Sequence, residues 1–163
     1  MTADIFRSDD KGRIVENWDV IDAYPKEIGE KDPIYGEVTL TDFDRTEENK
    51  KTIRRFFVDV LQNKEWDQFE NYVSDDLIQH NQEIAQGGKA YKQYLMNHDV
   101  TADFVFKVIG QGNLVVAYSK MWIANQDYAI MQLFRLEAGK IVEHWDNKEV
   151  MPKKSELTNL GKF

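Results

Sequence analysis

The chain has 163 residues, which is enough for one domain with a hydrophobic core and an additional segment. It carries 21 Lys and Arg against 29 Asp and Glu, a net charge of −8. The acidic excess is concentrated in residues 1–44, which hold 5 basic and 12 acidic side chains, whereas residues 45–163 hold 16 and 17. Neither part has the basic surface that nucleic acids or anionic membranes attract, so we expect neither partner.

The absence of cysteine excludes disulfides, thiolate metal sites and a cysteine nucleophile. The three histidines, at positions 80, 98 and 144, lack the close spacing typical of zinc or iron sites, and we expect no metal and no other cofactor. The sequence has neither a glycine-rich phosphate loop nor a Gly-x-Ser-x-Gly nucleophile elbow. No apolar run approaches the ~20 residues of a membrane helix, and no apolar signal core opens the chain, which favours a cytoplasmic protein.

The first predicted element is a β-hairpin at residues 1–24, and its sequence recurs at residues 132–153. Each copy has an apolar strand, a polar turn with glycine and a second strand with alternating faces. With one extra residue in the first turn, the copies share Phe6, Arg7, Gly12, Ile14, Val15, Glu16, Trp18, Asp19, Pro25 and Lys26, which match Phe134, Arg135, Gly139, Ile141, Val142, Glu143, Trp145, Asp146, Pro152 and Lys153.

Only the second copy follows a domain that it could close. We therefore interpret residues 1–24 as the closing hairpin of a preceding, mostly missing copy of the domain, left over from a tandem-domain protein. Because an isolated two-stranded hairpin is marginally stable in water, we expect it to dock on the sheet of its own domain or of a partner protomer, by exchange.

Residues 25–44 contain two prolines, two glycines and many charges, and this composition predicts a connector to a domain at residues 45–163. The spacing of Asp44 and Glu47 predicts a helix N-cap with its reciprocal glutamate. A stripe typical of a core-facing helix follows at Ile53, Phe56, Phe57, Val60 and Leu61.

A short second helix is predicted near residues 66–73, a turn near residues 74–77 and a third helix at about 88–97. From Asp103 the apolar period changes to two, which predicts successive strands, the last three at about 114–124, 127–137 and 140–147. Helices followed by an antiparallel meander indicate the α+β class.

The last strand carries the best candidates for chemistry. Val142, His144 and Asp146 share one face of it, and Ile141, Glu143 and Trp145 share the other. A histidine and a carboxylate two residues apart suit a general acid or base and its partner. The alternative is an edge strand that shows its polar face to water.

The other candidates are ambiguous on sequence alone. His80, next to Asn81, suits either catalysis or a structural hydrogen bond. Tyr118, Trp122 and Gln132 on the strands, with Phe56 on the first helix, suit the wall of a small-molecule pocket. An aromatic sheet face equally suits a core or a dimer interface.

Residues 45–163 resemble the SnoaL-like polyketide-cyclase branch of the nuclear transport factor 2-like superfamily. The matching blocks are residues 72–76 (Tyr-Val-Ser-Asp-Asp), 78–81 (Ile-Gln-His-Asn), 87–88 (Gly-Gly), 108–115 (Val-Ile-Gly-Gln-Gly-Asn-Leu-Val) and 134–146, which ends in Glu-His-Trp-Asp. The chain departs from the family pattern at Gln82, where proline is usual, and at Asn147-Lys148, which replace the usual Val-Ile.

The resemblance implies helices packed as a cone on a strongly curved antiparallel sheet, a cystatin-like fold with an apolar pocket. It also implies a homodimer and cofactor-independent acid–base chemistry, as a lyase or an isomerase, on a small apolar or carbonyl-containing molecule. Asp146 would be the base, His144 and His80 its partners, and Asn81 and Tyr118 donors to a developing oxyanion. The alternatives are a non-catalytic ligand-binding or dimerisation module, and an interaction module that uses the acidic N-terminal arm.

Overall fold

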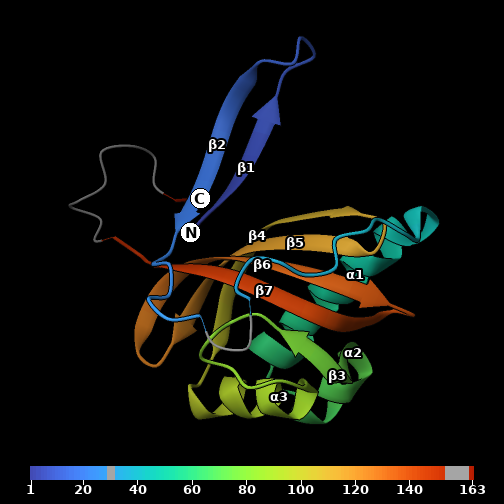
Figure 1. Ribbon diagram of the computed structural model, residues 1–163, viewed down its shortest axis with the longest axis vertical. Coiled ribbons are helices and arrows are strands. Elements are labelled where there is room, and N and C mark those ends of the chain that lie inside the picture. The colour runs from blue at the N-terminus through green and yellow to red at the C-terminus, as the bar shows by residue number, and fades with distance from the viewer. Residues whose placement is uncertain (29–31, 153–161) are drawn as a thin grey trace.

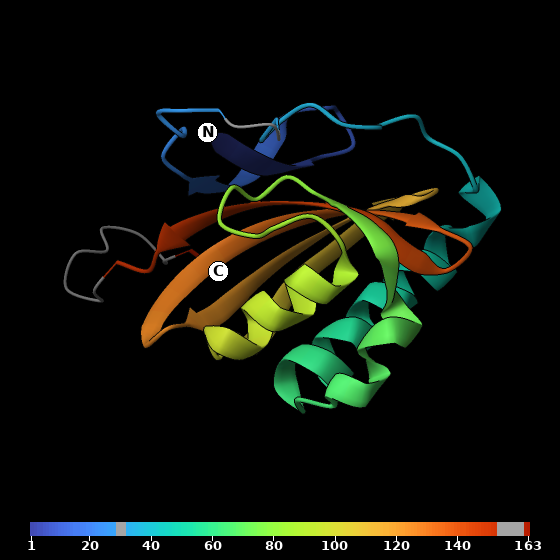
Figure 2. The same ribbon diagram turned by 60° about the horizontal axis from the view of Figure 1, so that its bottom comes forward.

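The computed structural model of the protein describes residues 1–28, 32–152 and 162–163. A curved five-stranded sheet forms the centre, with the helices on one face and a separate β-hairpin on the other (Figures 1 and 2). This is the α+β arrangement that the sequence predicts. The strands are β1 (Thr2–Ser8), β2 (Ile14–Ile21), β3 (Val73–Gln79), β4 (Thr101–Gln111), β5 (Leu114–Ile123), β6 (Gln126–Glu137) and β7 (Lys140–Val150).

Helix α1 (Thr46–Phe56) continues as one π-helical segment, Phe57–Gln62. All five residues of the predicted apolar stripe are buried, so the core-facing helix is confirmed. The predicted N-cap is wrong, because a 3₁₀ turn at Phe43–Arg45 moves the start of the helix to Thr46. The Thr46 hydroxyl donates back to the Phe43 carbonyl instead.

The remaining helices are a 3₁₀ turn (Trp66–Gln68), α2 (Phe69–Tyr72) and α3 (Gly88–Asn97). A Cβ atom at Gly88 would lie 2.3 Å from the Ser74 carbonyl oxygen, so α3 can begin this close to β3 only with glycine. No described helix is long and apolar enough to cross a membrane.

The strand order is β3-β7-β6-β5-β4, and β4 to β7 form the predicted antiparallel meander. The turn predicted near residues 74–77 is wrong, because these residues belong to strand β3. Strand β3 runs parallel to β7, so the sheet is mixed. The burial of β3 explains why the prediction failed: Val73, Leu77 and Gln79 are buried, whereas Asp75 and Asp76 are exposed. Adjacent charged residues on an edge strand resemble a turn in sequence.

A β-bulge lies in the last hairpin, where Leu136 pairs with Ile141 and Arg135 pairs with Glu143. Because the bulge adds a residue, Ile141 joins the helix-facing core rather than the face that carries Glu143. The predicted alternation along β7 holds only from Glu143 onward.

The β1–β2 hairpin docks on the sheet of its own domain, on the face opposite the helices (Figure 2). Ile5 and Val20 are buried there against Tyr118, Ala129 and Met131. Two hydrogen bonds fix the hairpin end: the Ile21 amide donates to Glu149, and the Lys148 amide donates to Asp22 at 3.0 Å. The turn of the hairpin projects beyond the sheet (Figure 1).

Val20→Ala should loosen the hairpin, because it removes two buried methyl groups, which contribute about 1.5–3 kcal/mol at a fully packed site. Ile21→Ala is the matched control, since the next side chain along the strand is exposed. Hydrogen exchange of the β1 and β2 amides should become roughly tenfold faster or more in the first variant and change little in the second. Equal exchange rates in both variants would show that the hairpin is not held by this contact.

Candidate active site

The end of β3 runs alongside strand β7 and is hydrogen-bonded to it. The last ladder pair is Gln79 with His144, and the His80 amide then donates to the His144 carbonyl at 3.0 Å. Successive side chains of an extended chain point to opposite faces, so His80 lies on the hairpin side of the sheet and Asn81 on the helix side. The sequence neighbours His80 and Asn81 therefore have different hydrogen-bond partners, Glu143 and Asp146.

Asp146 lies on the helix side and is only partly exposed. Asn81 Nδ2 donates to both carboxylate oxygens, at 2.8 and 2.9 Å. Burial nevertheless raises the pKa of Asp146 to about 6, and the negative charges of Asp22 and Glu83 act in the same direction. The Asn81 bond and the charge of Lys148 oppose this shift without cancelling it.

His144 is clamped between two rings, with centroids 4.9 Å from Tyr91 and 5.0 Å from Phe134. The Asn81 amide donates to Gln79 Oε1, which identifies that atom as oxygen, and His144 Nδ1 lies 3.1 Å from the same atom. The proton of a neutral ring is therefore on Nδ1, and Nε2 is an acceptor. Burial lowers the pKa of His144 to about 3, so the ring is uncharged at neutral pH.

Three buried polar atoms beside Asp146 have no hydrogen-bond partner among the described residues: the Tyr91 hydroxyl, Gln132 Oε1 and His144 Nε2. Their side chains and Asp146 line one cavity of about 10 Å³, which is room for about one water molecule. The apolar pocket that the family resemblance implies is therefore almost filled, with Ile84 of the β3–α3 loop among its walls. Orphaned polar atoms in such a place indicate a site for water or ligand atoms.

Asp146 also borders two larger spaces. One, of about 220 Å³ and here named the polar space, has mostly polar residues in its lining, among them His80, Asn81, Glu83 and Lys148, and lies under the end of the hairpin. The other, of about 610 Å³, lies between the hairpin and the sheet; its mainly apolar walls include Ile5, Ile34, Val116, Met131, Leu133 and Trp145.

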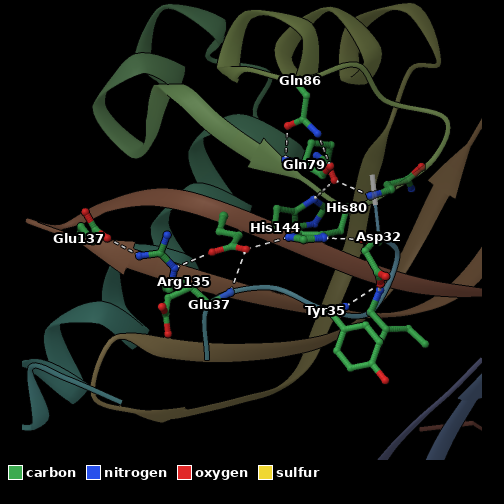
Figure 3. A network of polar contacts seen from close by, with 12 residues as sticks. Asp32, Tyr35, Glu37, Gln79, His80, Gln86, Arg135, Glu137 and His144 are labelled. Carbon is green, nitrogen blue, oxygen red and sulfur yellow. Dashed lines mark hydrogen bonds and ion pairs between the residues drawn. The ribbon is translucent and has the colours of Figure 1, made fainter. Parts of the chain in front are cut away.

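His80 belongs to a buried ion network on the hairpin side (Figure 3). Glu143 accepts from His80 Nε2 at 2.8 Å and from Arg135 Nε at 2.7 Å, and the Glu37 amide lies 3.3 Å from it. The other His80 nitrogen, Nδ1, lies 2.6 Å from the Asp32 carbonyl. Both ring nitrogens therefore lie beside oxygen acceptors.

This network holds Asp32 and Glu37 of the connector against the sheet. The Trp145 ring stacks on His80 at 4.4 Å, and Gly36 lies so close that a Cβ there would be 2.3 Å from Trp145 Cζ2. His80 and His144 thus make their hydrogen bonds on opposite sides of the sheet, although His80 and Asp146 both border the space of about 220 Å³.

The predicted pocket residues also lie in different parts of the structure. Gln132 lies opposite Asp146 on β6, as a pocket residue should, and Phe56 lies in the aromatic core against Phe57, Phe69, Tyr72, Tyr91 and Phe134. Tyr118 is on the hairpin side, where its hydroxyl donates to the Lys162 carbonyl at 2.6 Å. Trp122 shares that face, so neither of these residues can reach Asp146.

Sequence reasoning missed Tyr91 and Gln79. Tyr91 has the helical spacing of a core residue, and its unpaired hydroxyl becomes visible only in three dimensions. Among the described residues, no group of three His, Asp or Glu side chains is arranged to hold a metal ion.

Comparison with solved structures shows the nuclear transport factor 2-like fold. A candidate ketosteroid isomerase from Kribbella flavida matches 71% of this chain and 92% of its own, with 13% identity and a TM-score of 0.59. An LEH-like epoxide hydrolase from M. tuberculosis matches 64% and 85%, with 18% identity and a TM-score of 0.54. A candidate polyketide cyclase from Streptomyces antibioticus matches 63% and 92%, with 16% identity and a TM-score of 0.51. No protein-family model and no curated protein matches the chain.

The Glu143 network predicts a large stability difference between two equivalent residues. Glu143→Gln removes the buried counter-charge of Arg135, which keeps its ion pair with the exposed Glu137, and breaking a buried pair typically costs about 3–5 kcal/mol. Glu16→Gln removes the repeat's counterpart, an exposed partner of Arg7, and should change stability little. Urea unfolding measures both; similar midpoints for the two variants would contradict the structural role of Glu143.

Proposed function

We propose that the protein is a cofactor-independent acid–base enzyme that acts on a small apolar or carbonyl-containing molecule, with Asp146 as the base. The observation that carries the proposal is the combination of a carboxylate with a raised pKa and three unpartnered buried polar atoms around one cavity. A base with a pKa near the working pH removes protons more effectively than an ordinary aspartate.

Each residue has a distinct role in the proposed reaction. The Asp146 carboxylate takes a proton from the carbon next to a carbonyl group, and the electron pair of that C–H bond forms an enolate. The Tyr91 hydroxyl, which lacks a partner among the described residues, donates a hydrogen bond to the enolate oxygen. Protonated Asp146 then returns the proton to another carbon of the substrate, which completes an isomerisation. In an aldol-type cyclisation the enolate carbon first bonds to a second carbonyl carbon of the substrate, and Asp146 protonates the alkoxide that this forms.

Two neighbours position these groups. Asn81 holds the Asp146 carboxylate by two hydrogen bonds, and neutral His144 offers Nε2 as an acceptor to a substrate hydroxyl or a water. The small cavity requires the β3–α3 loop with Ile84 to move outward before a substrate can enter from the polar space.

The fold comparisons support this choice of chemistry, since the similar structures include a candidate isomerase, an epoxide hydrolase and a candidate cyclase. The second candidate, a non-catalytic ligand-binding module, is favoured by the near absence of space beside Asp146. The homodimer, with or without hairpin exchange, stays a prediction.

Asp146→Asn should lower the rate of proton removal by about 10²–10⁴-fold, the usual contribution of a general base. The assay follows deuterium uptake next to the carbonyl in a panel of cyclic ketones dissolved in D₂O. The matched control is Asp19→Asn, because Asp19 is the counterpart of Asp146 in the repeat and lies on the hairpin. A panel on which wild type and Asp146→Asn give the same rates would contradict catalysis by Asp146 and favour the binding module.

The pH profile gives a separate test. The base must be ionised, so the rate should rise through a pKa of about 6 and level off above it. A profile that is flat between about pH 5 and pH 8 would contradict the assignment.

Stability should show the opposite trend. The folded-state pKa of about 6 lies above the usual 3.8, so folding opposes ionisation of Asp146, and stability falls as the pH rises through this interval. Asp146→Asn keeps an acceptor for Asn81 without the charge. Its melting temperature should exceed that of wild type by about 2–6 °C near pH 8 and match it near pH 4. Calorimetry at both pH values checks the sign.

A further inference from the structure

The sequence repeat is also a repeat of three-dimensional structure. Phe6 pairs with Asn17 as Phe134 pairs with His144, and Arg7 pairs with Glu16 as Arg135 pairs with Glu143. The ladder shifts register directly after Arg7 and directly after Arg135. Even the ion pair recurs, with Nε to Oε2 distances of 2.5 Å in the first copy and 2.7 Å in the second.

The two copies differ in what covers them. In the second copy, Phe134 and Ile141 are 0% exposed because the helical layer packs on that face. In the first copy, the counterparts Phe6 and Ile14 are 56% and 63% exposed. The opposite face of the hairpin, with Ile5 and Val20, is already packed on the sheet. The hairpin therefore presents the helix-binding face of a closing hairpin, and none of the described helices packs on it.

We propose that this exposed face of β1–β2 binds the helical layer of a second nuclear transport factor 2-like unit, one that lacks its own last two strands. The intact copy shows the contacts expected. Phe134 meets Phe56 and Phe57 edge-on at 6.3 Å, and Phe6 would meet the equivalent helix in the same way. Asp19 would occupy the place of Asp146 and meet the equivalent of Asn81.

A second copy of this chain is a poorer occupant. Its helical layer is already covered by its own β6 and β7. Packing two hairpins face to face would bring the exposed Asp4 carboxylates together beside Asp19, which lies directly opposite Asp4 in the ladder and is paired with Lys162. An incomplete unit of the same fold avoids both conflicts.

The test supplies such a unit. The register aligns Met1 with Ala129, so residues 43–128 of this chain, joined directly ahead of Met1 of the full chain, form a unit whose β6 and β7 are β1 and β2. We expect the added segment to fold: trypsin should cleave it at least about tenfold more slowly than in the same fusion with Phe6→Asp. The β1 and β2 amides should exchange more slowly than in the unfused chain.

Two results would overturn the proposal. One is rapid cleavage of the added segment at the same rate in the fusion with the native Phe6 and in its Phe6→Asp variant, which would show that the hairpin face does not complete the unit. The other is a dimer of the unfused full chain, seen by light scattering, that Phe6→Asp dissociates and Ile78→Asp, a substitution at an exposed site on β3, does not. That result would show that a second copy covers the face.

Discussion

Strand β7 is buried on both faces, and the rest of the molecule depends on this constraint. Helices cover one face and the connector and hairpin cover the other, so the side chains in the middle of β7, Glu143 to Asp146, each point into one of two interiors. Asp146 and His144 enter the helix side, and Glu143 and Trp145 enter the hairpin side. A shift of register by one residue would exchange these sets, and the ladders to β3 and β6 prevent it.

The buried carboxylates on the two sides of the sheet have different partners. On the hairpin side, Glu143 forms an ion pair with Arg135 and a hydrogen bond with His80, and the network holds Asp32 and Glu37 of the connector against the sheet. On the helix side, Asp146 has a neutral donor in Asn81 and acidic neighbours in Asp22 and Glu83. The first arrangement stabilises the fold, whereas the second keeps a carboxylate in an environment that disfavours its charge. Such a group is expected at a site where it takes up a proton.

The N-terminal hairpin affects the site as well as the fold. It lies over the outer face of the sheet, and residues at its two ends border the polar space next to Asp146. Access to the proposed base therefore depends on a segment outside the five-stranded domain. This arrangement couples hairpin docking, through Val20 and Asp22, to the entrance of the site.

Much of the fold could be predicted because period and burial agree. The stripe from Ile53 to Leu61, the α3 boundaries and the β4–β7 meander follow from local patterns. Strand β3 was missed because two adjacent aspartates on an exposed edge resemble a turn. At the site, the sequence predicted that His144 and Asp146 share one face of the last strand and that Gln132 belongs to a pocket, but it did not relate the two strands to each other. It could not separate His80 from Asn81, since their opposite directions depend on where β3 ends against β7.

The burial of Tyr91 next to Asp146 was equally invisible, because the contact joins α3 to β7 across a long sequence separation. The repeat was readable in sequence, but its meaning for packing required the exposed fractions of Phe6 and Ile14 beside those of their counterparts. In both cases the missing information is tertiary.

The most direct measurement is the titration of the Asp146 side-chain carboxyl by ¹³C NMR, with Asp146→Asn used to assign the resonance. A desolvated base beside unpartnered polar groups should titrate with a pKa of about 6. Titration near the ordinary value of 3.8 would show that the carboxylate is solvated and would contradict its role as the base.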